Sequence, residues 1–195
     1  MKVLLLHQYF NTPQTGGPLR SYFLATALAE RGILPIVITT HQEKKYRVEF
    51  SEGMEIHYLP IPYQNKYGFY RRGWAFVKFA FGILRLAGKF REARLCYAIS
   101  VPLTVGLAAL ALRKFYRLPY IFEVGDLWPD APIELGFISN PILKRNLYAI
   151  EKRIYDRATA IVALSDPIRK RIEARTSERS VHLIHNMADT EFLKP

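Results

Sequence analysis

Short apolar runs alternate along the chain with longer amphipathic segments. Seven runs of aliphatic and β-branched residues are expected to form strands, at 3–6, 34–39, 54–59, 95–99, 120–124, 160–164 and 181–184. Helical patterns lie between them, near 18–31, 73–92, 103–116, 141–157 and 167–175. The runs are rich in consecutive apolar and β-branched residues, which suits strands that are covered on both faces. This alternation predicts a Rossmann-like three-layer α/β/α domain with a mostly parallel sheet of about seven strands.

Two apolar stretches resemble membrane or export signals but are interpreted as parts of this fold. Residues 95–112 carry no charge over 18 positions, which is the lower limit for a spanning helix. Pro102 interrupts this stretch and its first half is typical of a strand, so we expect a buried strand followed by a buried helix. The apolar core at 3–6 is too short for a signal peptide and is expected to be the first strand.

The hydrophobic content, the cysteine count and the net charge limit the class of protein and its partners. Half of the residues are hydrophobic, which is typical of a globular chain, and the single cysteine, Cys96, excludes an internal disulfide framework. The formal net charge of +11 predicts an anionic partner. No nucleic-acid-binding motif accompanies that charge, so we expect no nucleic acid partner. The five histidines are scattered, and no metal site is expected.

The stretch "QTGGPLR" joins the first strand to the first helix. Glycines let the backbone approach a ligand closely, and the following helix offers free N–H groups with partial positive charge. Gly16, Gly17 and Arg20 are therefore candidates for binding a diphosphate. The spacing matches neither the dinucleotide fingerprint nor the P-loop, so a tight turn without a ligand remains the alternative.

The stretch "FEVGDLWPD" contains the end of the fifth expected strand and the residues that follow it. Ligands of doubly wound sheets bind at the carboxyl ends of the strands, where this segment should lie. Carboxylates at this position bind sugar hydroxyls or act as a base, so Asp126 is a candidate for the base, and Glu123, Trp128 and Asp130 are candidates for binding a sugar. The alternatives are that Asp126 caps a turn and that Trp128 only packs.

Basic and aromatic residues alternate between 67 and 94. Such a helix suits an anionic membrane surface, and the alternative is an ordinary solvated face. The expected membrane contacts are Arg71, Arg72, Lys78, Arg85 and Lys89.

Taken together, these residues resemble the N-terminal half of a GT-B glycosyltransferase of family GT4. The resemblance rests on "KVLLLHQYF", "GGPLRSYFLATALAERG", "LPYIFEVGDLWP", "EKRIYDRATAIVALSDPIRKRI" and "VHLIHNMADTEFLKP", which follow in that order over the whole chain. The "DLWPD" version is similar to the bacterial subgroup that builds O-antigen, capsule or exopolysaccharide on lipid carriers.

The resemblance implies retaining transfer of a sugar from a nucleotide-sugar to a lipid-linked or saccharide acceptor, with no metal or other cofactor. Residues 1–185 would be the acceptor-side domain and 186–195 the start of an interdomain linker. The C-terminal domain that grips most of the donor would be absent, so the chain alone is expected to be inactive. The implied location is cytoplasmic and peripheral, on the inner face of the cell membrane.

Two positions depart from the family pattern. Gly125 stands where many members have a histidine near the transferred sugar, and Met187 replaces a common glycine. Asp126 is therefore a substitute candidate for the catalytic contact. Two other functions stay open: half of a nucleotide-sugar 2-epimerase, and a non-catalytic module that binds a membrane or a partner.

Overall fold

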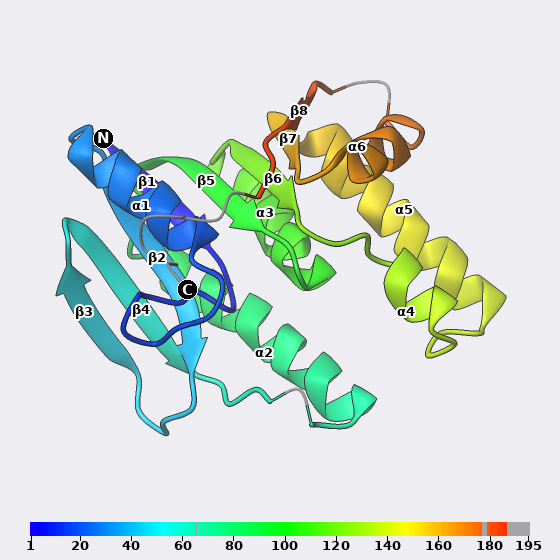
Figure 1. Ribbon diagram of the computed structural model, residues 1–195, viewed down its shortest axis with the longest axis horizontal. Helices are drawn as coiled ribbons and strands as arrows, with labels where there is room; N and C mark the ends of the chain where they lie inside the picture. The colour runs from blue at the N-terminus through cyan, green and yellow to red at the C-terminus, as the bar shows by residue number, and fades with distance from the viewer. Residues whose placement is uncertain (65, 177–178, 187–195) are drawn as a thin grey trace, which may run out of the picture.

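The computed structural model describes residues 1–64, 66–176 and 179–186. Within them, one eight-stranded sheet has the order β3-β4-β2-β1-β5-β6-β7-β8 (Figure 1). The strands are β1 (Lys2–Leu6), β2 (Leu34–His41), β3 (Arg47–Ser51), β4 (Met54–Pro60), β5 (Ala93–Ile99), β6 (Tyr120–Val124), β7 (Ala160–Ala163) and β8 (Val181–Leu183). The helices are α1 (Arg20–Glu30), α2 (Phe69–Ala87), α3 (Leu103–Tyr116), α4 (Asp130–Glu134), α5 (Pro141–Arg157) and α6 (Asp166–Glu173). The predicted α/β class with a mostly parallel sheet is confirmed.

The sheet has one strand more than the sequence pattern predicted. β3 pairs antiparallel with β4, and all other neighbouring pairs are parallel. Its outer position leaves Val48 and Phe50 exposed, so it lacks the continuous apolar run of the buried strands. Glu52 and Gly53 form the hairpin turn at positive φ values of 50° and 75°.

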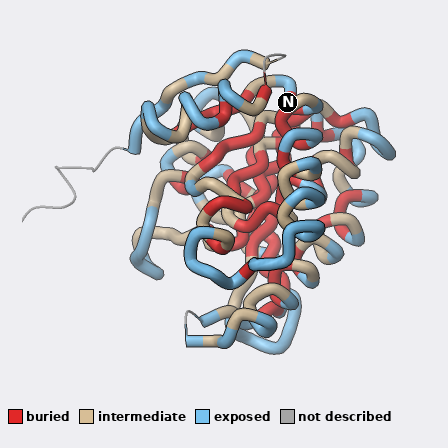
Figure 2. Tube along the Cα trace, turned by 90° about the vertical axis from the view of Figure 1, so that its right-hand side faces the viewer, coloured by how far each residue is buried: buried red, intermediate tan, exposed pale blue. Residues whose placement is uncertain are grey.

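Two hydrophobic cores lie on opposite faces of the sheet because side chains alternate along each strand. Leu4 and Leu6 join a large core with side chains of α2, α3, α5 and α6, whereas Leu5 joins a smaller core with α1. Figure 2 shows the buried strands running through the middle of the molecule, with the exposed segments around them. The three predicted layers are therefore present.

The uncharged stretch 95–112 is divided between β5 and α3, as expected. Both elements contribute fully buried residues to the large core, among them Cys96 and Leu112. Among the described residues, every helix is too short or too polar to cross a membrane.

Two helices carry a proline in their first turn. The Asn140 side chain accepts hydrogen bonds from the backbone N–H groups of Ile142 and Leu143, with Pro141 at the start of α5. Ser165 caps α6 in the same way, ahead of Pro167. Of the predicted linker, all but Asn186 lies outside the described residues, and so does Met187.

Candidate functional site

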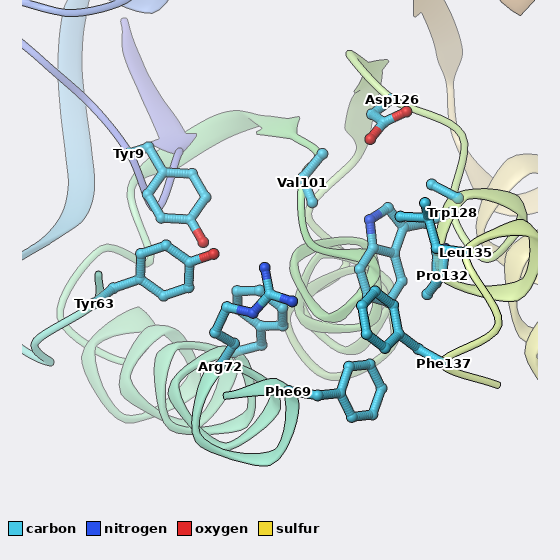
Figure 3. Close-up of a pocket in the computed structure, with 12 residues that line it drawn as sticks. Tyr9, Tyr63, Phe69, Arg72, Val101, Asp126, Trp128, Pro132, Leu135 and Phe137 are labelled. Carbon is cyan, nitrogen blue, oxygen red and sulfur yellow. The ribbon is translucent and has the colours of Figure 1, made fainter. Parts of the chain in front are cut away.

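A pocket of about 230 Å³ lies at the carboxyl ends of the strands (Figure 3). Its walls come from the loops after β1, β4, β5 and β6, from the first two turns of α2, and from the α4 region. Strand order reverses between β1 and β5, so the pocket adjoins the switch point where such sheets bind ligands. The lining residues are Tyr9, Tyr63, Phe69, Arg72, Phe76, Val101, Asp126, Trp128, Ala131, Pro132, Leu135 and Phe137.

A chain of aromatic rings runs along the pocket. The ring centroids of Tyr9 and Tyr63 are 4.9 Å apart, Tyr63 stacks on Phe76 at 5.7 Å, and Phe76 meets Trp128 edge-on at 6.1 Å. Trp128, a predicted sugar contact, therefore both packs against the core and faces the pocket. At another point of the wall, Phe69 stacks on Phe137 at 5.3 Å, which links α2 to the segment after α4.

Asp126 is exposed and its carboxylate lies at the edge of the pocket (Figure 3). Its Oδ1 accepts a hydrogen bond from the Leu127 N–H at 2.9 Å, so the predicted turn-capping role is also present. A Cβ at Gly125 would approach the Ser100 carbonyl oxygen to 3.2 Å. This crowding gives a physical reason for a glycine where many members of the resembling family have a histidine.

Arg20 and Glu123, predicted for different ligands, bind each other. Arg20 Nε and Nη2 donate to the two oxygens of Glu123 at 3.0 and 3.1 Å, and the Tyr97 hydroxyl donates to the same carboxylate at 2.6 Å. Glu123 is buried. Arg20 also donates to the His185 carbonyl, so its side chain joins α1, β6 and the segment after β8. Both oxygens of Glu123 are thus occupied by protein groups.

Both glycines of the loop adopt the left-handed backbone conformation, which glycine tolerates without steric cost. Gly16 and Gly17 have positive φ values of 69° and 95°, and both are exposed. A Cβ at Gly17 would lie 2.9 Å from Asn11 Nδ2, so a side chain there would displace Asn11. The first helical residue is Arg20, and no side chain caps the helix, which leaves N–H groups of its first turn without a side-chain partner.

Asp130 lies in a buried ion network rather than in the pocket. Arg175 donates to Asp130 through Nη2 and to Glu151 through Nη1, with distances of 2.6 to 2.8 Å. Tyr148 and Tyr155 donate to the same two carboxylates. Burial raises the pKa of Asp130, but the hydrogen bonds from Arg175 and Tyr148 together lower it by more. The pKa of Asp130 is therefore below its ordinary value. The network joins α4, α5 and the end of α6.

Most of the predicted membrane-contacting cations are exposed. Arg71, Lys78 and Arg85 alternate on α2 with Tyr70, Trp74 and Phe81, which expose 89%, 59% and 69% of their surface. We call these six residues the α2 stripe. Lys89 lies beyond the end of the helix, with its Nζ 5.9 Å from the centre of the Tyr46 ring.

Arg72 departs from this pattern. Its guanidinium points into the pocket rather than away from the protein (Figure 3). Arg72 Nε and the Tyr9 hydroxyl oxygen are shut off from solvent; Arg72 Nε forms no hydrogen bond with the described residues, and the polar neighbour of the Tyr9 hydroxyl is that of Tyr63. Sequence reasoning missed Tyr9 and Tyr63 altogether. Both follow strands closely, in "HQYF" and "PIPY", and their position past a strand's carboxyl end was the available signal.

The described part of the chain contains no cluster of three or more His, Cys, Asp or Glu side chains that can hold a metal ion.

Comparison with known families gives a match over most of the chain. Residues 15–187 match the family described as "Glycosyl transferase 4-like domain". A search of curated proteins finds no match.

Several solved structures share the fold at low sequence identity. Sucrose-phosphate synthase from Thermosynechococcus elongatus superposes with a TM-score of 0.68 at 15% identity, over 97% of this chain and 49% of that one. HepE from Anabaena, in complex with UDP and glucose, gives 0.58 at 15% identity, over 98% and 46%. A UDP-N-acetylglucosamine 2-epimerase gives 0.53 at 10% identity, over 94% and 47%. The chain thus spans about half the length of these proteins.

Proposed function

Since the chain belongs to the glycosyl transferase 4-like family, we propose that it is the acceptor-side domain of a retaining glycosyltransferase. The proposed enzyme moves a sugar from a nucleotide-sugar to a lipid-linked acceptor during cell-surface polysaccharide synthesis. The observation that carries the proposal is the pocket at the carboxyl ends of the strands, which combines an aromatic wall with the carboxylate of Asp126.

The donor would lie beside this pocket, with its diphosphate against the Gly16–Gly17 loop and the first turn of α1. HepE has been crystallised with UDP-glucose, which supports a nucleotide-sugar as donor. Most donor contacts would come from a second domain, and no metal is needed in this proposal. The Arg20–Glu123 pair would fix the first turn of α1 against β6 and so position its N–H groups.

Asp126 would touch the acceptor hydroxyl and assist its deprotonation. Positioned acid–base groups contribute about 10²- to 10⁴-fold to a rate, so Asp126→Ala in the protein that carries both domains should lower turnover by about 100-fold or more. Vesicle binding should be unchanged. Wild-type turnover in the variant would contradict a role for Asp126 in the reaction.

The α2 stripe would hold the domain on the cytoplasmic face of the membrane. Its exposed aromatic rings suit the interfacial zone, and Arg71, Lys78 and Arg85 suit anionic headgroups. Three further apolar side chains are exposed close to Phe137 in the sequence, namely Leu135, Ile142 and Leu143. Phe137 itself contacts Phe69 at the start of α2.

Vesicle sedimentation tests this membrane contact. Each basic residue near an anionic surface contributes about 1 kcal/mol, so Lys78→Glu with Arg85→Glu should weaken binding to phosphatidylglycerol vesicles by at least about tenfold. The matched control reverses Arg94 and Lys170, which are exposed and lie on β5 and α6. Equal losses in the two double variants would reduce the effect to net charge and contradict the stripe as the docking face.

The epimerase alternative has weaker support. It calls for several carboxylates and histidines around a sugar, whereas the pocket is lined by one carboxylate, Asp126, and by no histidine among the described residues.

A further inference from the structure

The pocket holds two polar groups that the described protein does not fully pair. Neither Arg72 Nε nor the Tyr9 hydroxyl is accessible to solvent; Arg72 Nε forms no hydrogen bond, and the Tyr9 hydroxyl interacts only with the hydroxyl of Tyr63 among the described residues. A buried polar group without a partner costs about 1–3 kcal/mol, and each such group calls for an explanation. A bound ligand that accepts hydrogen bonds from both groups would remove this cost.

The same end of the pocket is positively charged. Arg72 forms no ion pair with any described carboxylate. Burial raises the pKa of Tyr9, so its hydroxyl stays a neutral donor. The Tyr63 hydroxyl lies next to that of Tyr9 in Figure 3. A cation beside hydroxyl donors favours an anion, and the planar guanidinium fits phosphate oxygens in particular.

The rest of the pocket is apolar. Phe76, Trp128 and Pro132 form its wall, and Leu135 and Phe137, which are largely exposed, lie where it opens. Phe137 stacks on Phe69, the residue before Tyr70 of the α2 stripe. A volume of about 230 Å³ is below the usual range for a drug-sized ligand. It holds a phosphate and a short part of a larger molecule, whose apolar remainder would leave beside the membrane-facing stripe.

We propose that Arg72 and Tyr9 bind the phosphate of a lipid phosphate acceptor, whose apolar chain passes Trp128 and leaves the pocket beside the stacked rings of Phe69 and Phe137. The inference rests on the proposed function and specifies its acceptor class. It also moves Arg72 from the expected membrane contacts to the acceptor site. Asp126, on another side of the pocket, is left free to meet the sugar hydroxyl of the same acceptor.

Binding of geranyl phosphate to the 195-residue chain tests the proposal without requiring sugar transfer. Trp74 and Trp128 are the only tryptophans, so Trp74→Phe makes the pocket residue the sole fluorescence reporter. Geranyl phosphate should quench Trp128 and bind at least about tenfold more tightly than geraniol, because hydrogen bonds to charged groups are the strong ones. Inorganic phosphate should bind far more weakly than geranyl phosphate.

Variants of the two donors localise the phosphate. Arg72→Met should weaken geranyl phosphate binding by about tenfold or more and abolish the preference over geraniol. Arg94→Met removes the same charge at the start of β5 and should leave the affinity within about twofold. Tyr9→Phe removes one oxygen atom and keeps the ring packed on Tyr63, so it tests the site even if Arg72→Met unfolds.

Three results would overturn the inference. They are equal affinity for geranyl phosphate and geraniol, equal effects of Arg72→Met and Arg94→Met, and inorganic phosphate binding as tightly as geranyl phosphate, which would indicate a site for free phosphate. Intact, Arg72-dependent binding together with a complete absence of sugar transfer by the two-domain protein would instead count against the proposed function alone.

Discussion

His7 follows β1 directly and lies against the first turn of α1, where its Nδ1 is 2.7 Å from Ser21 Oγ. Burial lowers the pKa of its imidazole from 6.5 to about 4, so the ring is neutral in the folded protein at pH 7. Protonation therefore favours the unfolded chain, whose histidine has the ordinary pKa. Protonation of His7 therefore makes the stability of the fold around the glycine loop depend on pH.

The stability of the domain should fall as pH drops from 6.5 towards 4, because the unfolded state binds a proton that folded His7 does not. The full shift corresponds to about 3 kcal/mol, and His7→Gln should remove this part of the pH dependence. Urea unfolding of both proteins between about pH 7.5 and pH 4.5 measures the difference, in line with the linkage relation. Parallel pH curves for the two proteins would contradict the assignment.

Two helix glycines should respond in opposite directions to alanine. At Gly106 of α3 an added Cβ would lie 2.8 Å from Ile154 Cδ1, whereas at Gly73 of α2 nothing lies within 4 Å. Gly106→Ala should destabilise the domain by about 1–3 kcal/mol through overpacking. Gly73→Ala should stabilise it by up to about 1 kcal/mol through helix propensity. Thermal unfolding followed by circular dichroism measures the midpoint temperature of each variant. Equal shifts of this temperature in the two variants would refute the packing argument.

The site residues were predictable only in part, for a physical reason. Asp126 and Trp128 stand in one short segment after β6, so a local motif places them at the strand ends. Tyr9, Tyr63 and Arg72 come from separate segments that meet only when β1 and β4 share a sheet. Arg72 precedes the buried Phe76 and Phe79 by four and seven residues, so the helical repeat already places it on the inner face of α2.

At the scale of elements, the Arg175 network holds the α4, α5 and α6 region together. Glu151 is fully buried and Asp130 is 4% exposed, so both carboxylates depend on Arg175 for compensation. Burial also raises the pKa of Glu151, which shows that desolvation acts against its charged form. Asp130 begins α4, so the network also supports one wall of the pocket.

Arg175→Met should destabilise the domain by about 3–5 kcal/mol, because it leaves two buried carboxylates uncompensated. The matched control is Arg171→Met, since Arg171 is 53% exposed and makes a single 3.3 Å contact with Asp130. That change should cost less than about 1 kcal/mol. Chemical denaturation compares the two, and similar losses would show that the network contributes no more than a surface ion pair.

The strands that the sequence predicted and the one strand that it missed, β3, differ in burial. β1, β2 and β5 each contain an apolar run of four or five residues, because the two hydrophobic cores cover both of their faces. β3 has only β4 as a neighbour, and its alternating "RVEFS" carries no such run. The Glu52-Gly53 turn was the available hairpin signal.

At the scale of the whole molecule, the pocket opens at one end of a sheet whose strand order reverses beside it. The α2 stripe and the pocket share the first turns of α2, so a membrane-bound acceptor could reach Asp126 without leaving the surface. The chain spans about half the length of the solved proteins with this fold. A nucleotide-sugar held by a second half would meet the acceptor at this edge.

The 195-residue chain on its own should fold but transfer no sugar, since most donor contacts are assigned to the other half. Circular dichroism should show a cooperative unfolding transition. Release of nucleoside diphosphate from UDP-glucose should equal the rate without protein. Protein-dependent transfer by this chain alone would contradict the assignment of the donor site.

The most direct test of the account is sugar transfer by the protein isolated from its source. Radiolabelled nucleotide-sugars would be supplied with a lipid extract of the same cells. The account predicts that label from one of these donors passes into the organic phase as a glycolipid, in proportion to the protein added. Its central claim would be contradicted if no donor in the panel gave protein-dependent labelling of a lipid or saccharide while the protein still bound vesicles.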